Sequence, residues 1–147
     1  MRLLLQRVSR ASVSVRGTLV AEIGLGCLLL VGVGKDDGSD LDRLAEKVFH
    51  LRVFEDGQGK MNRSLSDVGG EILVVPQFTL FGDVRKGRRP SWDGAAPPEM
   101  AEDRVEAFAR ALEVRGATVK RGVFREHMEV ELVNDGPVTL FIDSETR

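Results

Sequence analysis

Near the start of the chain, apolar residues alternate with polar ones in the manner of a strand that is buried on one face: Leu3, Leu5, Val13 and Val15. Arg16-Gly17 then offers a turn before residues 19–23, so the two segments predict a hairpin. Residues 27–31 and 72–75 are apolar without alternation, which indicates strands covered on both faces. We expect these two runs to lie at the centre of a sheet.

Two later stretches predict the main helices, because their apolar residues recur at helical spacing. The first has them at Leu41, Leu44, Ala45, Val48 and Leu51. Ser39 or Asp40 can cap its start, and Asp56-Gly57 follows its end. The second has them at Ala101, Val105, Phe108, Ala109 and Leu112. Pro98 suits the first turn of this helix, and Gly116 suits its C-terminal cap.

The end of the chain has the pattern of a second hairpin. Val130 and Leu132 alternate with glutamates, residues 134–137 (Asn-Asp-Gly-Pro) form a turn sequence, and residues 138–142 follow as a strand. With 147 residues and 42% hydrophobic content, the chain can bury one substantial core. The order of the elements predicts a single α/β domain over residues 1–147, with curved, mostly antiparallel, barrel-like sheets and two main helices packed outside.

Charge and cysteine content restrict the partners and the compartment. The net charge is −2, so no overall positive field attracts nucleic acid, and any contact with RNA must be local. Residues 85–89 hold a basic cluster that suits phosphates, and a solvated surface loop is the alternative explanation. Cys27, the one cysteine, lies in an apolar run and is expected to be a small buried side chain. No segment resembles a signal peptide or reaches transmembrane length, so we expect a cytoplasmic protein without membrane contact.

Several common kinds of active site find no support in the sequence. His50 and His127 have no cysteine, histidine or carboxylate neighbours at metal-ligand spacing, so no metal site is expected. The glycine-rich stretch 24–35 has Leu29 where nucleotide-binding patterns need glycine, and Asp36 follows where a P-loop needs Ser or Thr. No Gly-x-Ser-x-Gly motif occurs. We therefore expect an activity without a cofactor.

Two short segments carry the remaining signal. By residue type alone, segment 77–80 (Gln-Phe-Thr-Leu) is the end of a strand and segment 134–137 is a turn. The two segments nevertheless resemble the signature motifs of the D-aminoacyl-tRNA deacylases, and the resemblance extends in family order from Gln6-Arg7-Val8 to Thr139. The intermediate matches are Leu51-Arg52-Val53-Phe54, Gly59-Lys60-Met61-Asn62-Arg63-Ser64 and Lys86-Gly87-Arg88-Arg89-Pro90-Ser91-Trp92.

The resemblance implies a reaction and a way of rejecting L substrates. It implies that a homodimer hydrolyses the ester bond of D-aminoacyl-tRNA, and of glycyl-tRNA(Ala), at the 3′-terminal adenosine. Gly136-Pro137 would have a cis peptide bond and reach into the active site of the other subunit. Its backbone carbonyls would hold the α-amino group and leave no room for an L side chain. Arg7 would orient this dipeptide, unless it is simply an exposed cation, and Asn134 would brace the turn.

The same resemblance assigns the chemistry to the end of the second buried strand. The backbone N–H groups of Phe78 and Thr79 would stabilise the ester oxygen as it becomes negative, with help from the Gln77 amide. Thr79 has no neighbouring base in the sequence, so a positioning role is expected rather than a nucleophilic one. The 2′-hydroxyl of the terminal adenosine would assist the hydrolysis. The adenosine would lie near Phe124 and Met128, for which core packing is the alternative role.

The sequence departs from the family pattern at three positions. Arg125 and Glu126 stand where small residues are usual, beside the expected adenosine pocket. Pro76 replaces a usual serine and removes one hydroxyl and one N–H. Related animal deacylases that act on L-alanyl esters can carry proline at this position, whereas Phe78 keeps the D-specific pattern.

A non-catalytic nucleic-acid-binding module is the competing hypothesis. It predicts a salt-sensitive affinity for RNA without turnover of an ester. The net charge of −2 weighs against it. A purely structural dimer is a third hypothesis, but it explains none of the motifs.

Overall fold

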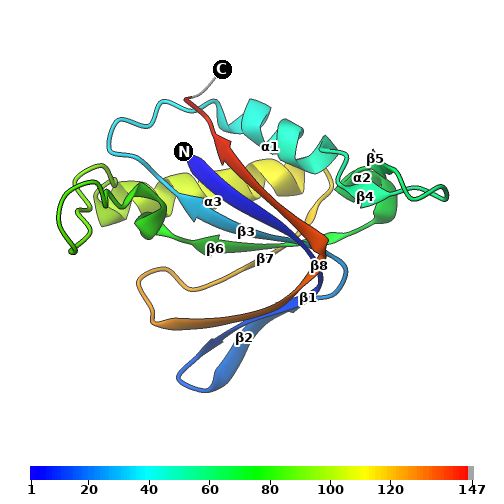
Figure 1. Cartoon of the computed structure of the whole chain (residues 1–147), viewed down its shortest axis with the longest axis horizontal. Helices are drawn as coiled ribbons and strands as arrows, with labels where there is room; N and C mark the ends of the chain where they lie inside the picture. The colour runs from blue at the N-terminus through cyan, green and yellow to red at the C-terminus, as the bar shows by residue number, and fades with distance from the viewer. Residues whose placement is uncertain (146–147) are drawn as a thin grey trace.

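A six-stranded sheet forms the centre of the protein, in a computed structural model that describes residues 1–145. Its strands are β1 (Arg2–Val15), β2 (Thr18–Ile23), β3 (Gly26–Gly32), β6 (Glu71–Pro76), β7 (Thr118–Arg121) and β8 (Met128–Asp143). They lie in the order β2-β1-β3-β6-β7, and β8 also pairs with β1 (Figure 1). β1 is antiparallel to β2, β3 and β8, whereas the β3-β6 and β6-β7 pairs are parallel.

Two main helices, α1 (Leu41–His50) and α3 (Pro98–Val114), lie on the same side of this sheet (Figure 1). Asp40 caps α1, because its side chain accepts a hydrogen bond from a backbone N–H of the first turn. Pro98 opens α3, and Gly116 follows its end with a φ of 95°, the left-handed conformation that ends many helices. The smaller elements lie in the connections: β4 (Phe54–Glu55), β5 (Met61–Arg63), α2 (Leu65–Val68) and the 3-10 helix η1 (Phe78–Phe81).

The two central strands are buried on both faces, as their apolar runs predict. Toward the helices, Leu29 of β3 and Val74 of β6 belong to the larger cluster of buried side chains, together with Phe108 of α3. On the other face, Leu28 and Leu73 pack in a smaller cluster with the later part of β1 and the first part of β8. The sheet therefore curves over on itself like an incomplete barrel, with the helices outside.

The predicted α/β class, with a curved barrel-like sheet and two outer helices, is confirmed, and so is the hairpin of the first two strands. The sequence analysis missed β7 and the β4-β5 pair. These strands have two to four residues each, which is too few to show an alternation.

The predicted hairpin at the end of the chain is wrong. β8 is one continuous strand, and both of its halves pair with β1 instead of with each other. The register jumps between the Val8–Asn134 and Gln6–Thr139 pairs, so that residues 135–138 bulge out of the ladder. The proline in this segment has no N–H to give to the ladder, and it therefore marks a bulge here rather than a turn.

Arg7 and Asn134 hold the bulge of β8 in place. Arg7 is only 5% exposed, so it is not a surface cation. Its Nε donates to the carbonyl of Asp135 at 3.0 Å, and its Nη1 donates to a second backbone carbonyl at 2.6 Å. Asn134 donates from Nδ2 to the carbonyls of Arg7 and Val138, at 2.9 and 3.0 Å. The bulge is thus a fixed feature: its start is bonded to Arg7 of β1, and the Asn134 amide ties its last residue, Val138, back to that start.

Phe108→Ala tests the packing of the larger core. The Phe108 side chain has no exposed surface, so its truncation should leave a cavity and lower the free energy of unfolding by about 3–5 kcal/mol. Urea denaturation measures the loss. Val114→Ala on the same helix is the control, because Val114 is 84% exposed and its truncation should change stability by less than about 0.5 kcal/mol. Similar losses in the two variants would contradict the packing described here.

Gly136→Ala tests the geometry of the bulge. Gly136 has a φ of 121°, which L side chains rarely adopt, and a Cβ there would lie 2.5 Å from Nη2 of Arg7. We expect the free energy of unfolding to fall by about 2 kcal/mol, measured by urea denaturation. In the control Gly57→Ala, the new Cβ has open space around it, and stability should stay the same or rise slightly. A stable Gly136→Ala protein would mean that Arg7 does not hold the bulge as described.

Candidate functional site

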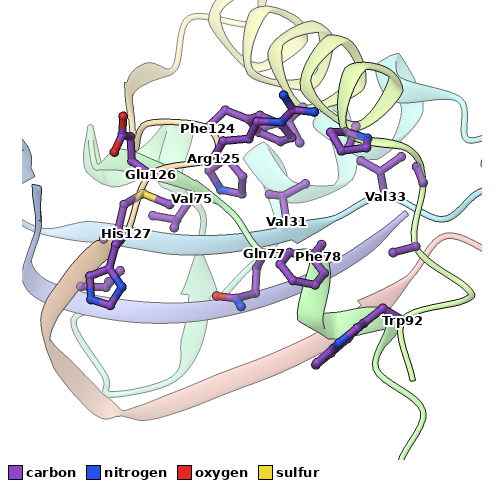
Figure 2. Close-up of a pocket in the computed structure, with 18 residues that line it drawn as sticks. Val31, Val33, Val75, Gln77, Phe78, Trp92, Phe124, Arg125, Glu126 and His127 are labelled. Carbon is purple, nitrogen blue, oxygen red and sulfur yellow. The ribbon is translucent and has the colours of Figure 1, made fainter. Parts of the chain in front are cut away.

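A cavity of about 780 Å³ opens where β3 and β6 end. The carboxyl ends of neighbouring parallel strands are the common place for ligands in open α/β sheets. The cavity wall comes from the ends of both strands, the start of η1, the loop before α3, the first turns of α3 and the segment that leads into β8 (Figure 2). Aliphatic side chains form much of it, and its polar and aromatic groups belong to Gln77, Phe78, Trp92, Phe124, Arg125, Glu126, His127 and Met128.

A close approach between β3 and η1 positions one wall of this cavity. The N–H of Gln77 donates to the carbonyl of Val31 at 2.7 Å, which continues the β3-β6 ladder beyond the end of β6. A Cβ on Gly32 would meet the carbonyl oxygen of Gln77 at 2.8 Å and the Cβ of Leu80 at 3.1 Å. Glycine at this position therefore lets η1 cross the end of β3 and brings Gln77 and Phe78 to the cavity.

The first two N–H groups of η1 are free. A 3-10 helix bonds each N–H to the carbonyl three residues earlier, so its first bond runs from the N–H of Leu80 to the carbonyl of Gln77, at 3.2 Å. The N–H groups of Phe78 and Thr79 precede this bond and have no acceptor among the described residues. They are available to a ligand oxygen.

The side chains that follow β6 are fixed by their neighbours. Gln77 donates a short hydrogen bond from Nε2 to the hydroxyl of Thr79. The ring of Phe78 is 55% exposed and meets the ring of Trp92 edge-on, with 5.2 Å between the centroids. Thr79 itself does not line the cavity, and within residues 1–145 no histidine or lysine is hydrogen-bonded to its hydroxyl. Its observed contact is therefore one that orients the Gln77 amide.

Phe124 lies across the cavity from Gln77 and Phe78 (Figure 2), and Met128 lines the same cavity. Phe124 is partly buried and also packs against the larger core, so it both lines the cavity and supports the fold. The sulfur of Met128 accepts a hydrogen bond from the N–H of Val123 at 3.3 Å. These contacts fix an apolar surface at the position where the family resemblance implies the base of a terminal adenosine.

The remaining predicted residues form a second cluster at the bulge of β8. Arg7, Asn134, Gly136 and Pro137 are absent from the wall of the cavity in their own chain. The Gly136-Pro137 peptide bond is cis, and both residues of this dipeptide are exposed. The structure thus brings the predicted residues together as two separate groups.

Two residues that the sequence analysis left without a role, Trp92 and His127, also line the cavity. The sequence around each of them gave some indication of a place near the site. Trp92 ends a segment that resembles the family, and His127 directly precedes Met128. Only the fold brings the loop before α3 and the segment before β8 to the same cavity, and no local pattern indicates that.

The protein has few groups for nucleophilic or metal chemistry at this site. Cys27 is buried in the larger core, and burial raises the pKa of its thiol to about 12, so the thiol stays protonated at neutral pH. Within residues 1–145, no group of three or more His, Cys, Asp or Glu side chains could hold a metal ion. In the same part of the chain, no helix has the length and apolar character to cross a membrane.

The loop between η1 and α3 carries the basic cluster. Arg85 lies 2.6 Å from the carboxylate of Asp83, and its hydrogen bonds lower the pKa of this carboxyl to about 2. Lys86, Arg88 and Arg89 are exposed and form no ion pair with other described residues. Three of the four cations in this cluster therefore remain uncompensated.

Known proteins with similar sequences and folds match almost the whole chain. The D-aminoacyl-tRNA deacylase of Thermomicrobium roseum is 63% identical over 145 residues, which cover 98% of this chain and 94% of that protein. The D-aminoacyl-tRNA deacylase of Heliobacterium modesticaldum is 58% identical, over 97% of this chain and 96% of that protein. A solved structure of a c-Myc DNA Unwinding Element Binding Protein has a TM-score of 0.91 at 40% identity, with 98% and 99% covered. A probable eukaryotic D-amino acid tRNA deacylase has the same fold, with a TM-score of 0.83 at 20% identity and 96% and 97% covered.

Both clusters of site residues fall within a match to one protein family. The match covers residues 4–143, and the family is described as D-Tyr-tRNA(Tyr) deacylase. It therefore includes the strand end at the cavity, the apolar wall opposite it and the bulge of β8. The chain belongs to the D-Tyr-tRNA(Tyr) deacylase family.

Proposed function

We propose that this protein hydrolyses the ester bond that joins a D-amino acid to the terminal adenosine of a tRNA, and that glycyl-tRNA(Ala) is a second substrate. The products are the free amino acid and the tRNA. The observation that carries the proposal is the pair of free N–H groups at Phe78 and Thr79, beside a cavity with an apolar opposite wall. The names of similar proteins support it. We further propose that residues 1–147 act as one domain in the cytoplasm.

In the proposed reaction, water attacks the carbonyl carbon of the ester. The carbonyl oxygen becomes negative in the tetrahedral intermediate, and it accepts hydrogen bonds from the N–H groups of Phe78 and Thr79. The bond to the 3′-oxygen of the terminal ribose then breaks, and the leaving oxygen takes up a proton. The neighbouring 2′-hydroxyl of the ribose orients the water, while the protein supplies position and electrostatic stabilisation.

The cavity is of a suitable size and character for the end of an aminoacyl-tRNA. Its volume of about 780 Å³ lies in the range of small-ligand sites. Phe124 and Met128 offer an apolar surface to the face of the terminal base, and the paired rings of Phe78 and Trp92 border the other side. The ester would then lie close to the end of β6, within reach of the free N–H groups.

We propose a homodimer in which each subunit completes the site of the other. Gly136 and Pro137 are exposed but lie outside the cavity of their own chain, so a role in the site requires a second copy. Large apolar side chains of the same strand, β8, are exposed in a single chain: Val133, Leu140 and Phe141. Exposed apolar groups gathered on one element are typical of an interface.

In this arrangement, the D preference comes from steric exclusion. The rigid carbonyls of Gly136 and Pro137 hold the α-amino group, and an L side chain would collide with the backbone between them. Glycine has no side chain to exclude, and for this reason glycyl esters are included as substrates. Pro76 lines the same cavity in place of the usual serine, and this makes the ratio of D to L hydrolysis the most informative quantity for this chain.

A non-catalytic nucleic-acid-binding module is the second candidate. One observation favours it, because a similar solved structure is that of a DNA-unwinding-element binding protein. The free cations Lys86, Arg88 and Arg89 offer contacts to phosphates. The net charge of −2 opposes strong binding of nucleic acid in general. A binding module also has no need for two free N–H groups beside an apolar cavity wall.

The direct test uses D-tyrosyl-tRNA and L-tyrosyl-tRNA in parallel, with purified protein and with tRNA esters alone as the background. We expect the D ester to be hydrolysed at least about 100-fold faster than the L ester, because exclusion by a rigid backbone discriminates more sharply than weaker attraction. The release of each amino acid is followed over time. Equal rates, or no release above background, would rule out the proposed function. Salt-sensitive tRNA binding without release would favour the module.

Thr79→Ala separates a positioning role from a nucleophilic one. If the hydroxyl only orients Gln77, the single-turnover rate with D-tyrosyl-tRNA should fall by less than about tenfold. Removing a covalent nucleophile typically costs on the order of 10⁴-fold or more. Thr118→Ala, at an exposed threonine of β7, is the matched control and should leave the rate unchanged. A loss of several thousandfold in Thr79→Ala alone would identify Thr79 as the nucleophile.

A further inference from the structure

Arg125 has an unusual backbone conformation for a residue with a side chain. Its φ is 65°, and in the described part of the chain only Arg16 and Arg125 combine a positive φ with a residue other than glycine. A glycine would adopt this left-handed conformation freely, so the arginine side chain is present at a conformational cost. Residues in such conformations concentrate at functional sites, and the surroundings of Arg125 point to a specific function.

Arg125 brings an uncompensated positive charge to the cavity. Of the Arg, Lys, Asp and Glu residues, two line the cavity, Arg125 and its neighbour Glu126. The carboxylate of Glu126 lies 3.0 Å from the guanidinium of Arg16 and is thereby neutralised. Arg125 forms no ion pair within residues 1–145. Glu102 and Asp103 of α3 line a neighbouring hollow, yet neither carboxylate lies within 4.0 Å of the Arg125 guanidinium.

The surroundings of this charge fit a nucleotide. Phe124 and Trp92 contribute aromatic surface to the wall of the cavity, which suits the face of a base. Figure 2 shows Arg125 next to Phe124, on the side of the cavity away from Trp92. A guanidinium in this place can bind phosphate oxygens through two parallel N–H bonds. A nucleotide carries both a base and a phosphate, joined through its ribose, whereas a nucleoside has no phosphate for the cation to bind.

We infer that Arg125 binds the phosphate that links the terminal nucleotide of the RNA substrate to the rest of its chain. Arg125 thereby makes the cavity prefer an RNA 3′ end to a free nucleoside. The inference rests on the proposed function, because that function places the terminal adenosine in the same cavity. The phosphate does not react, so Arg125 is a specificity-determining residue that lowers KM and leaves kcat nearly unchanged.

The single tryptophan of the chain makes this inference measurable without turnover. Trp92 lines the cavity, so its fluorescence reports occupation of the site. The titrants are adenosine, adenosine 5′-monophosphate and inorganic phosphate. We expect the wild-type protein to bind the monophosphate about fivefold more tightly than adenosine. A gain in affinity of this size is what one partly exposed hydrogen bond between the Arg125 guanidinium and the phosphate would contribute. Inorganic phosphate alone should not change the fluorescence, because it lacks the base.

Four variants separate the charge of Arg125 from its backbone. Arg125→Met should bind both adenosine compounds equally, whereas Arg125→Lys should keep part of the preference, because it retains the charge without the planar fork. Arg125→Gly should also lose the preference, yet its Tm should rise by about 2 °C, because glycine relieves the left-handed backbone. Arg43→Met removes an exposed arginine of α1 and should change neither quantity.

The opposite results overturn the inference. Equal binding of the two compounds by the wild-type protein, or an unchanged preference in Arg125→Met, would show that Arg125 makes no phosphate contact. A fall in Tm for Arg125→Gly with the preference intact would show a purely structural role. Failure of the proposed function looks different. In that case, D-tyrosyl-tRNA would not be hydrolysed, while the nucleotide preference and its loss in Arg125→Met would still identify a phosphate site.

Discussion

The long antiparallel pairing of β1 with β8 is the interaction on which the rest of the structure depends. It joins the two ends of the chain, and it curves the sheet so that two clusters of buried side chains form on its opposite faces. The register of this pairing shifts at two neighbouring places, and at the larger shift, opposite Arg7, the buried guanidinium holds four residues of β8 out of the ladder. That shift leaves Gly136 and Pro137 exposed on the surface of a single chain, where the proposed dimer would bring them to the site of the other subunit.

Much of the fold can be predicted from the sequence, because apolar residues recur at regular spacing in its longer helices and strands. The central strands at 27–31 and 72–75 and the helix that Pro98 opens follow directly from apolar spacing. The end of the chain is different. A proline between two alternating segments is compatible with a turn and with a bulge, and the choice depends on whether a long partner strand is available. β1 is that partner, which no local pattern in β8 indicates.

The candidate site was predictable to a smaller extent. Gln77, Phe78, Phe124 and Met128 meet at one cavity, as the family resemblance implied, whereas residue types alone describe a strand end and core positions. Trp92 completes the wall from a long loop. Contacts of this kind, between segments far apart in the chain, leave no periodic pattern of apolar residues in the sequence. The free N–H groups of η1 likewise cannot be predicted from the types of side chain, because every residue except proline has a backbone N–H.

The site thus offers free backbone N–H groups beside an apolar surface, and under the proposed function the charges around it serve recognition. Burial protonates the one thiol, and a carboxylate at the cavity pairs with an arginine. The most direct test is a crystal structure with a non-hydrolysable D-aminoacyl-adenosine amide. We predict its carbonyl oxygen within about 3.1 Å of the Phe78 or Thr79 nitrogen, and its α-amino group at the carbonyl of Gly136 from a second copy of the chain. An amide bound outside the cavity, or an L analogue bound in the same way, would contradict this mechanism.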